Sequence, residues 1–171
     1  QTQYSVFDRR PEKGYLDYLK QHHIPMLCYG TLSGGFLAER WIGKKMEEPE
    51  TRSQVKYMQV IEDSLGWDGY LQLLLILKDI AEKYGVGISQ VASRYILSQE
   101  GVGAAIIGVR NSRHVEDNMR IFSFELSGED IQRIRSFLEQ YPTVEGEPFQ
   151  QERTVGSKYR SIMWMNLSEE E

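Results

Sequence analysis

A short segment rich in glycine and hydroxyl groups, Gly30–Gly35, has a composition suited to binding an anion. It contains three glycines, a threonine and a serine, and it directly follows an apolar run. A backbone without Cβ atoms can bring its N–H groups close to a phosphate, and hydroxyl groups add further donors. An ordinary glycine-rich turn has the same composition, so both interpretations remain open. The sequence has no Walker A loop here, because Gly43-Lys44 is followed by Lys45 and position 38 is Ala38.

A second segment that could bind an anion, Gly108–His114, follows another apolar run and contains Arg110 and Arg113. Asn111 or Ser112 could cap the helix that follows, which would direct free backbone N–H groups at whatever lies above the preceding strand. Arginines beside such a helix start favour a phosphate ligand, because guanidinium groups pair well with phosphate oxygens. The alternative is a solvated helix start with surface arginines.

The other candidate residues favour structural roles. His22-His23 has no carboxylate at metal-ligand spacing, so we interpret it as a surface pair. Cys28 lies within an apolar run and is expected to be buried rather than nucleophilic. No serine, cysteine or threonine has a recognisable base partner.

The elements that must position the two loops are short apolar strands. The strand candidates are Tyr4–Phe7, Ile24–Tyr29 and Ala104–Ile107, and each is followed by turn-forming residues. Short apolar runs bounded by turns are typical of strands that are buried on both faces of a parallel sheet.

Helical spacing fills the sequence between these strands. Apolar residues recur every three or four positions over Ile88–Ile96, and Trp67–Tyr84 is apolar almost all round in its middle, with Gly85 as a natural stop. Ser127 and Asp130 form a capping-box pattern ahead of an apolar stripe that extends to Tyr141.

The last part of the chain lacks this spacing. From Pro142 onward no periodicity is visible, which predicts a tail that crosses the surface of the fold. Within it, Met163-Trp164-Met165 is interpreted as an apolar anchor that holds the tail to the body.

Alternating strands and helices predict an α/β fold with a parallel sheet, whose ligands bind beyond the carboxyl ends of the strands. Three strands make a very small parallel sheet with two open edges, and such edges are prone to aggregate. We therefore expect a piece of a larger sheet or one half of an assembly.

Composition excludes several classes of function. The chain has 171 residues, of which 40% are hydrophobic and 26% charged, and its net charge is -5. These values exclude simple disorder and argue against nucleic-acid or membrane partners. The longest apolar run, Leu73–Leu77, is too short to span a bilayer. Cys28 is the single cysteine and cannot form an internal disulfide, which indicates the cytoplasm or another reducing compartment, organelles included.

Several segments together resemble the aldo-keto reductase family. They read QTQYS at residues 1–5, LCYGTLSGG at residues 27–35, GVGISQVA at residues 85–92 and IIGVR at residues 106–110, and Asn118 completes the series. The resemblance covers about residues 1–140. It implies that residues 1–141 form the carboxyl-terminal part of a (β/α)₈ TIM barrel, namely strands six to eight with their helices. Residues 142–171 would then be an irregular C-terminal tail.

The resemblance also implies NADPH as the cofactor of the complete protein. Gln1 would contact the nicotinamide carboxamide, and Tyr29 would stack on the nicotinamide ring. The residues implied at the pyrophosphate are Leu32, Ser33 and Gly34. Those implied at the adenosine end are Gly108, Val109 and Arg110, followed by His114, Asp117 and Asn118. Two positions depart from the family pattern, because His114 stands where Gln or Arg is common and Asp117 where Glu is usual.

The family reduces carbonyl groups to alcohols with a tyrosine acid that is assisted by lysine, aspartate and histidine. Those four residues belong to early barrel strands that this sequence does not match, so no catalytic residue is assigned here. The resemblance predicts the cofactor-binding portion of such an enzyme, inactive by itself and completed by an amino-terminal barrel half in the same or another chain. Two alternatives remain: a non-catalytic relic that is a structural or protein-binding subunit, and a regulatory nucleotide-binding module.

Overall fold

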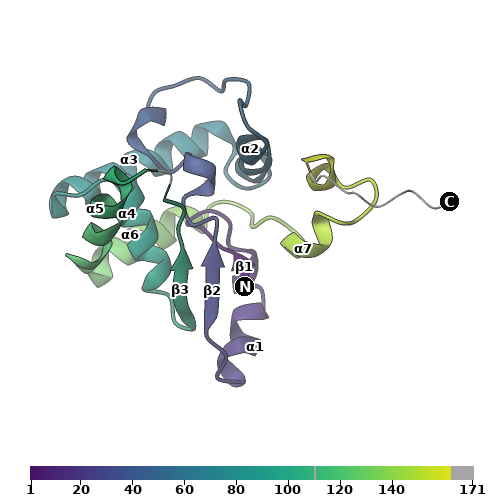
Figure 1. Ribbon diagram of the computed structural model, residues 1–171, viewed down its shortest axis with the longest axis horizontal. Coiled ribbons are helices and arrows are strands. Elements are labelled where there is room, and N and C mark those ends of the chain that lie inside the picture. The colour runs from purple at the N-terminus through teal and green to yellow at the C-terminus, as the bar shows by residue number, and fades with distance from the viewer. Residues whose placement is uncertain (110, 163–171) are drawn as a thin grey trace.

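A three-stranded parallel sheet lies at the centre of the fold. The computed structural model describes residues 1–109 and 111–162, so the expectations for Arg110 and for residues 163–165 lie outside the described residues. The strands are β1 (Thr2–Gln3), β2 (Met26–Tyr29) and β3 (Val102–Ile106), in the order β1-β2-β3. Both pairings are parallel (Figure 1), which confirms the predicted α/β class and the small parallel sheet.

The first strand differs from its prediction over Tyr4–Phe7. Pairing with β2 ends at Gln3, although the Tyr4 N–H still donates to the Tyr29 carbonyl at 3.1 Å. The chain then folds back, because the Ser5 N–H donates to the Asp8 carbonyl at 3.4 Å and the Asp8 N–H donates to Ser5 Oγ at 3.2 Å. Residues 4–7 are buried by this bend rather than by strand pairing.

The expectation that the strands are buried on both faces is wrong. In β2, the side chains of Met26 and Cys28 are buried, whereas that of Leu27 is exposed. Ile106 at the end of β3 is 45% exposed. Successive side chains of a strand point to opposite faces, so this alternation shows that the described helices cover one face of the sheet more fully than the other.

Seven α-helices accompany the sheet in the described part of the chain. Their bounds are α1 (Tyr15–Gln21), α2 (Arg52–Ser64), α3 (Gly66–Tyr84), α4 (Ile88–Leu97), α5 (Arg113–Met119), α6 (Gly128–Leu138) and α7 (Pro148–Gln151), counted over the described ranges. In Figure 1, α4 and α6 lie on the β3 side of the sheet, and α7 lies on the opposite side, beyond β1.

The helices expected at α3, α4 and α6 are confirmed with their end signals. Gly85 ends α3 in the left-handed conformation with φ 63°, and its N–H donates to carbonyl groups of the last turn. At α6 the Asp130 N–H donates to Ser127 Oγ at 3.2 Å, while the Asp130 carboxylate accepts from the Ser127 N–H. The middle of α3 is less enclosed than expected, since Leu75 is 50% exposed.

The tail after Pro142 contains α7 and a 3₁₀ turn over Lys158–Ile162. It returns to the body of the fold, where the side chains of Val144 and Tyr159 are buried. In the described part of the chain, none of the helices is long and apolar enough to cross a membrane.

Candidate functional site

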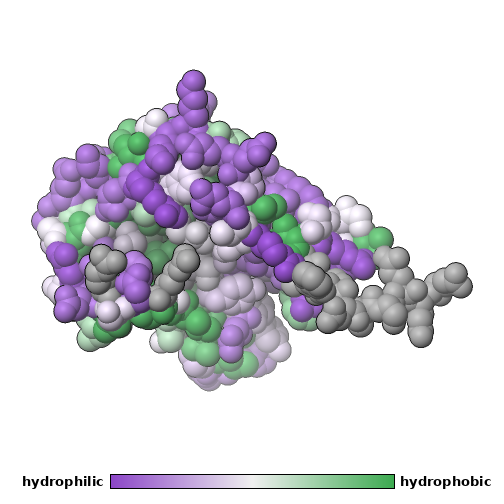
Figure 2. All heavy atoms as spheres, turned by 45° about the horizontal axis from the view of Figure 1, so that its top comes forward, coloured by the Kyte–Doolittle hydropathy of each residue, from purple (hydrophilic) through white to green (hydrophobic). Residues whose placement is uncertain are grey.

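A groove of about 680 Å³ lies beyond the carboxyl ends of β2 and β3. In a parallel sheet, this is where loops from neighbouring strands converge and ligands bind. The groove brings together residues from both loops that the sequence singled out: Leu32, Gly34, Gly108, His114, Asp117 and Asn118. Figure 2, turned so that the top of Figure 1 comes forward, shows mostly hydrophilic side chains over this end of the molecule.

The loop after β2 is a pair of tight turns. The Ser33 N–H donates to the Gly30 carbonyl at 2.8 Å, and the Gly35 N–H donates to the Leu32 carbonyl at 2.9 Å. Gly34 has φ 63°, and Ser33 has φ 49°, a value that L residues adopt rarely. The Ser33 side chain is buried, and its hydroxyl has no hydrogen-bond partner in the described part of the chain. Ser33 therefore shapes the turn from inside and does not line the groove.

Helix α2 forms one wall of the groove and explains two of the glycines. A Cβ atom at Gly30 would lie 2.2 Å from the Tyr57 hydroxyl oxygen, and one at Gly34 would lie 2.9 Å from Ser53 Oγ. Both distances are far shorter than carbon–oxygen contact, so only glycine lets the loop approach α2 this closely. Ser53 and Tyr57 line the groove but were not singled out from the sequence.

A sequence signal for α2 does exist. Thr51 and Gln54 form a capping box, in which the Gln54 N–H donates to Thr51 Oγ1 at 3.2 Å and the Thr51 N–H donates to Gln54 Oε1 at 3.1 Å. This pattern predicts the start of a helix at position 52. It does not predict which side of the helix meets the glycine loop.

Hydrogen bonds hold the far end of the loop. The Gly35 carbonyl accepts from Trp41 Nε1 at 2.9 Å and from the Arg40 guanidinium at 3.2 Å. Glu39 Oε1 accepts from the Ile88 N–H at 2.6 Å, which ties the loop to the first turn of α4. Ala38 and Arg40 form part of the wall of the groove, and this wall is therefore attached to α4.

The β3 side of the groove is more open. Ser112, one of the two predicted capping residues, directly precedes α5, but its side chain makes no capping hydrogen bond. His114 and Asp117 are exposed, and Asn118 is half-buried. The Asp117 carbonyl accepts from Gln90 Nε2 at 3.1 Å, which attaches α5 to α4.

Three further residues of the expected set lie outside the lining of the groove. Gln1 is exposed ahead of β1, and Val109 is 53% exposed beyond β3. Tyr29 is half-buried at the end of β2, with Lys56 Nζ 5.7 Å from the centre of its ring. Burial raises the pKa of its phenol, so the side chain stays neutral at physiological pH.

Cys28 and the histidine pair, which are expected from the sequence to be structural, lie in the core and at the surface respectively. Cys28 is fully buried, which confirms the expected packing, and burial raises the pKa of its thiol to about 12. His22 and His23 are exposed. Over residues 1–109 and 111–162 there is no group of three or more His, Cys, Asp or Glu side chains that could hold a metal ion.

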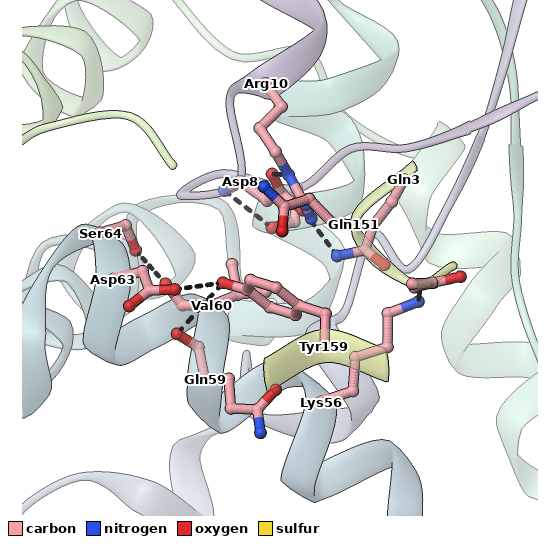
Figure 3. Close-up of polar contacts among 12 residues, drawn as sticks. Gln3, Asp8, Arg10, Lys56, Gln59, Val60, Asp63, Ser64, Gln151 and Tyr159 are labelled. Carbon is pink, nitrogen blue, oxygen red and sulfur yellow. Dashed lines mark hydrogen bonds and ion pairs between the residues drawn. The ribbon is translucent and has the colours of Figure 1, made fainter. Parts of the chain in front are cut away.

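A second polar cluster lies next to β1, beneath the tail (Figure 3). The Arg10 guanidinium donates to both Asp8 carboxylate oxygens at 2.7 Å, and Gln3 Nε2 donates to Asp8 Oδ2 at 2.6 Å. All three side chains are almost completely buried. Because the two charges neutralise each other inside the protein, this cluster is suited to holding the chain rather than to binding a ligand.

The sequence model of the "Aldo/keto reductase family" matches residues 1–139. The chain is 30% identical over 145 residues to "Aldo-keto reductase YhdN" of Bacillus subtilis, covering 81% of this chain and 41% of the relative. It is 21% identical over 136 residues to the "L-glyceraldehyde 3-phosphate reductase" of Escherichia coli O157:H7, covering 78% and 39%. The chain thus spans about 40% of the length of these curated relatives.

Solved structures show the same likeness in the fold. The glycerol dehydrogenase AKR11B4 from Gluconobacter oxydans superimposes with a TM-score of 0.67 at 24% identity, over 85% of this chain and 43% of that one. The holo form of the aldo-keto reductase AKR11C1 from Bacillus halodurans gives 0.59 at 21% identity, over 80% and 41%.

Proposed function

This chain belongs to the aldo/keto reductase family, and from that membership we propose that it forms the carboxyl-terminal, cofactor-binding portion of an NADPH-dependent reductase. Members of the family are NAD(P)H-dependent oxidoreductases. The observation that carries the proposal is the groove at the ends of β2 and β3, which unites the predicted pyrophosphate loop with the predicted adenosine loop.

The groove has features that fit a dinucleotide. Its volume of about 680 Å³ lies within the range of small-molecule sites. The glycine loop has no Cβ atoms at Gly30 and Gly34, and the Tyr57 hydroxyl beside them has no partner among residues 1–109 and 111–162. A hydroxyl beside a glycine turn is suited to a phosphate oxygen.

Each part of the groove has a proposed role. Leu32 and Gly34 would flank the pyrophosphate. The ring of Tyr29, at the end of β2 and outside the lining of the groove, would offer a flat surface to the nicotinamide. His114, Asp117 and Asn118 would contact the adenosine end. When bound, the cofactor would supply the hydride that reduces an aldehyde or ketone to an alcohol, while these residues bind and orient it.

We also propose that the three strands are the sixth to eighth of a barrel, completed by an amino-terminal half in the same or another chain. Two findings support this. The outer edges of β1 and β3 pair with no other strand of the described residues, and the chain matches only part of the length of its relatives. Apolar side chains at the end of β3, in α5 and just after α5 are exposed, and a neighbouring barrel element could cover them: Ile106, Val115, Met119 and Phe122.

Cofactor choice in the complete protein tests the proposal. Arg110→Ala should weaken binding of NADPH far more than binding of NADH, because NADPH alone carries the 2′-phosphate that an arginine would contact. We expect a loss of roughly tenfold or more for NADPH, in the range of a charge-assisted hydrogen bond. Equal losses for both cofactors would contradict the assignment.

The 171-residue chain alone should not consume NADPH with any aldehyde, because no general acid is assigned to it. Turnover above background would contradict this expectation.

A non-catalytic binding subunit is the second candidate. The exposed apolar side chains of α5 and the residues after it favour this function, because a stable partner could cover them. A stoichiometric partner that protects Met119 and Phe122 and lacks reductase motifs would support the second candidate against the first.

A further inference from the structure

Helix α2 contacts two different parts of the chain with two different faces. Ser53 and Tyr57, which lie one helical turn apart, face the glycine loop and line the groove. Lys56 and Asp63 lie on the side that meets the tail. The helix therefore stands between the proposed cofactor groove and the residues after position 142.

The contact on the groove face is tight. A Cβ atom at Gly34 would lie 2.8 Å from the Tyr57 ring as well as 2.9 Å from Ser53 Oγ. Contacts this close mean that a small shift of α2 changes the width of the groove at the loop that would hold the pyrophosphate. Protein interiors transmit such shifts because they are closely packed.

The contact on the tail face is polar and partly buried (Figure 3). The Tyr159 hydroxyl donates to Asp63 Oδ2 at 2.5 Å, and Lys158 also pairs with Asp63. Lys56 forms an ion pair with Glu152, and neither side chain is more than one-sixth exposed. Burial strengthens the Lys56–Glu152 pair relative to a surface ion pair.

The tail is itself held by the segment after β1. The ring of Tyr159 lies over the Arg10 guanidinium, with 5.6 Å between the guanidinium carbon and the ring centre, and Tyr159 is only 4% exposed. Arg10 is in turn fixed by Asp8. The tail thus connects α2 to the rigid buried cluster beside β1.

The segment that leads into α2 provides little support of its own. Residues 43–50 have no regular secondary structure apart from the end of a turn, and most of their side chains are exposed. The position of α2 is therefore set by its packing against α3 and the glycine loop and by its contacts with the tail.

We propose that Glu152 and Tyr159 are positioning residues, which hold α2 against the glycine loop and so set the affinity of the groove for its dinucleotide. This inference rests on the proposed function. It assigns to the tail a role in cofactor binding without contact with the cofactor.

The test compares the same chemical change at two sites of the tail. Glu152→Gln removes the partner of Lys56 on α2, whereas Glu145→Gln removes the partner of Lys13, which lies before α1. We expect Glu152→Gln and Tyr159→Phe each to raise the Kd for NADPH by about fivefold or more, within the usual range of coupling between two sites. Glu145→Gln should change the Kd by less than about twofold.

Hydrogen exchange of the cofactor-free chain supplies the second readout. Glu152→Gln should increase exchange in α2 and leave α4 unchanged, because the ion pair that it breaks joins the tail to α2. If α2 and α4 loosen equally, or α2 does not change, the positioning role is wrong. If the wild-type chain and the complete protein bind no NADPH while α2 alone loosens, the proposed function fails and the tail contact stands.

Discussion

The two polar regions of this molecule use charged and hydroxyl groups in opposite ways. Beside β1, Asp8, Arg10 and Gln3 are buried and hydrogen-bonded to one another. In the groove above β2 and β3, His114 and Asp117 are exposed, and the Tyr57 hydroxyl has no hydrogen-bond partner among the described residues.

This difference separates a structural cluster from a candidate binding site. A buried charge that has its partner inside the protein is expensive to disturb, because removing the partner leaves the charge uncompensated. Polar groups that face an open groove are hydrated, because fewer protein groups surround them. They can exchange that water for a ligand. The groove, and not the more densely bonded cluster, is therefore where we place the cofactor.

The largest expected effect comes from breaking the buried cluster. Asp8→Asn leaves the Arg10 guanidinium buried without a neutralising charge, which typically costs about 3–5 kcal/mol. The free energy of unfolding from chemical denaturation should fall by that amount. The matched control is Lys13→Gln, which removes an ion pair between exposed side chains and should cost less than about 1 kcal/mol. A small effect at Asp8 would erase the contrast between the two regions.

A smaller effect is expected at the wall of the groove. Gly30→Ala would place a Cβ atom 2.2 Å from the Tyr57 hydroxyl, at a residue with φ 70°. Overpacking and strain should together cost about 2–4 kcal/mol in the free energy of unfolding. Gly14→Ala is the control, because Gly14 has φ 88° but none of the described residues comes within 4 Å of an added Cβ.

A double-mutant cycle sharpens this prediction. Tyr57→Phe removes the oxygen nearest to position 30, so it should recover part of the cost of Gly30→Ala. Equal costs for Gly30→Ala with and without the Tyr57 hydroxyl would show that the glycine is required by its backbone conformation alone.

The smallest expected effect concerns Asp130, a paired carboxylate in neither region. Burial opposes its ionisation, but hydrogen bonds from Lys83, Ser127 and Tyr84 outweigh it and lower its pKa to about 2. The pKa is thus lower in the folded than in the unfolded chain, so its contribution to stability is present above about pH 4. That contribution is lost as the pH falls toward 2.

Asp130→Asn should cost about 0.5–2 kcal/mol at neutral pH, the usual value of a helix cap. It should also flatten the fall in stability between about pH 4 and pH 2, measured by denaturation at each pH. A parallel acid curve for the variant and the wild type would assign the acid sensitivity to other carboxylates.

The sequence predicts best those elements whose signals are local. The amphipathic spacing of α4, the Ser127–Asp130 cap of α6 and the Gly85 stop of α3 each depend on residues within a few positions of one another. The first strand was misplaced, because Tyr4–Phe7 has strand-like composition while its course is set by the fold-back between Ser5 and Asp8.

The site shows the same division. The glycine loop and the segment after β3 were identified from composition, and the fold brings them to one groove. Ser53 and Tyr57 were missed because their role arises from the approach of α2 to the loop, more than 15 residues away along the chain. The contact of Tyr159 with Asp63 spans 96 positions and has no local signal.

The most direct measurement is a titration of the isotopically labelled chain with NADPH, followed through its backbone amide NMR signals. We expect shifts at Leu32, Gly34, Gly108 and Asn118, which line the groove. We expect none at Glu12 and Gln99, which line a separate cavity of about 280 Å³ on the side of α1. No shift at millimolar cofactor, or shifts confined to that other cavity, would contradict the assignment of the groove as the cofactor site.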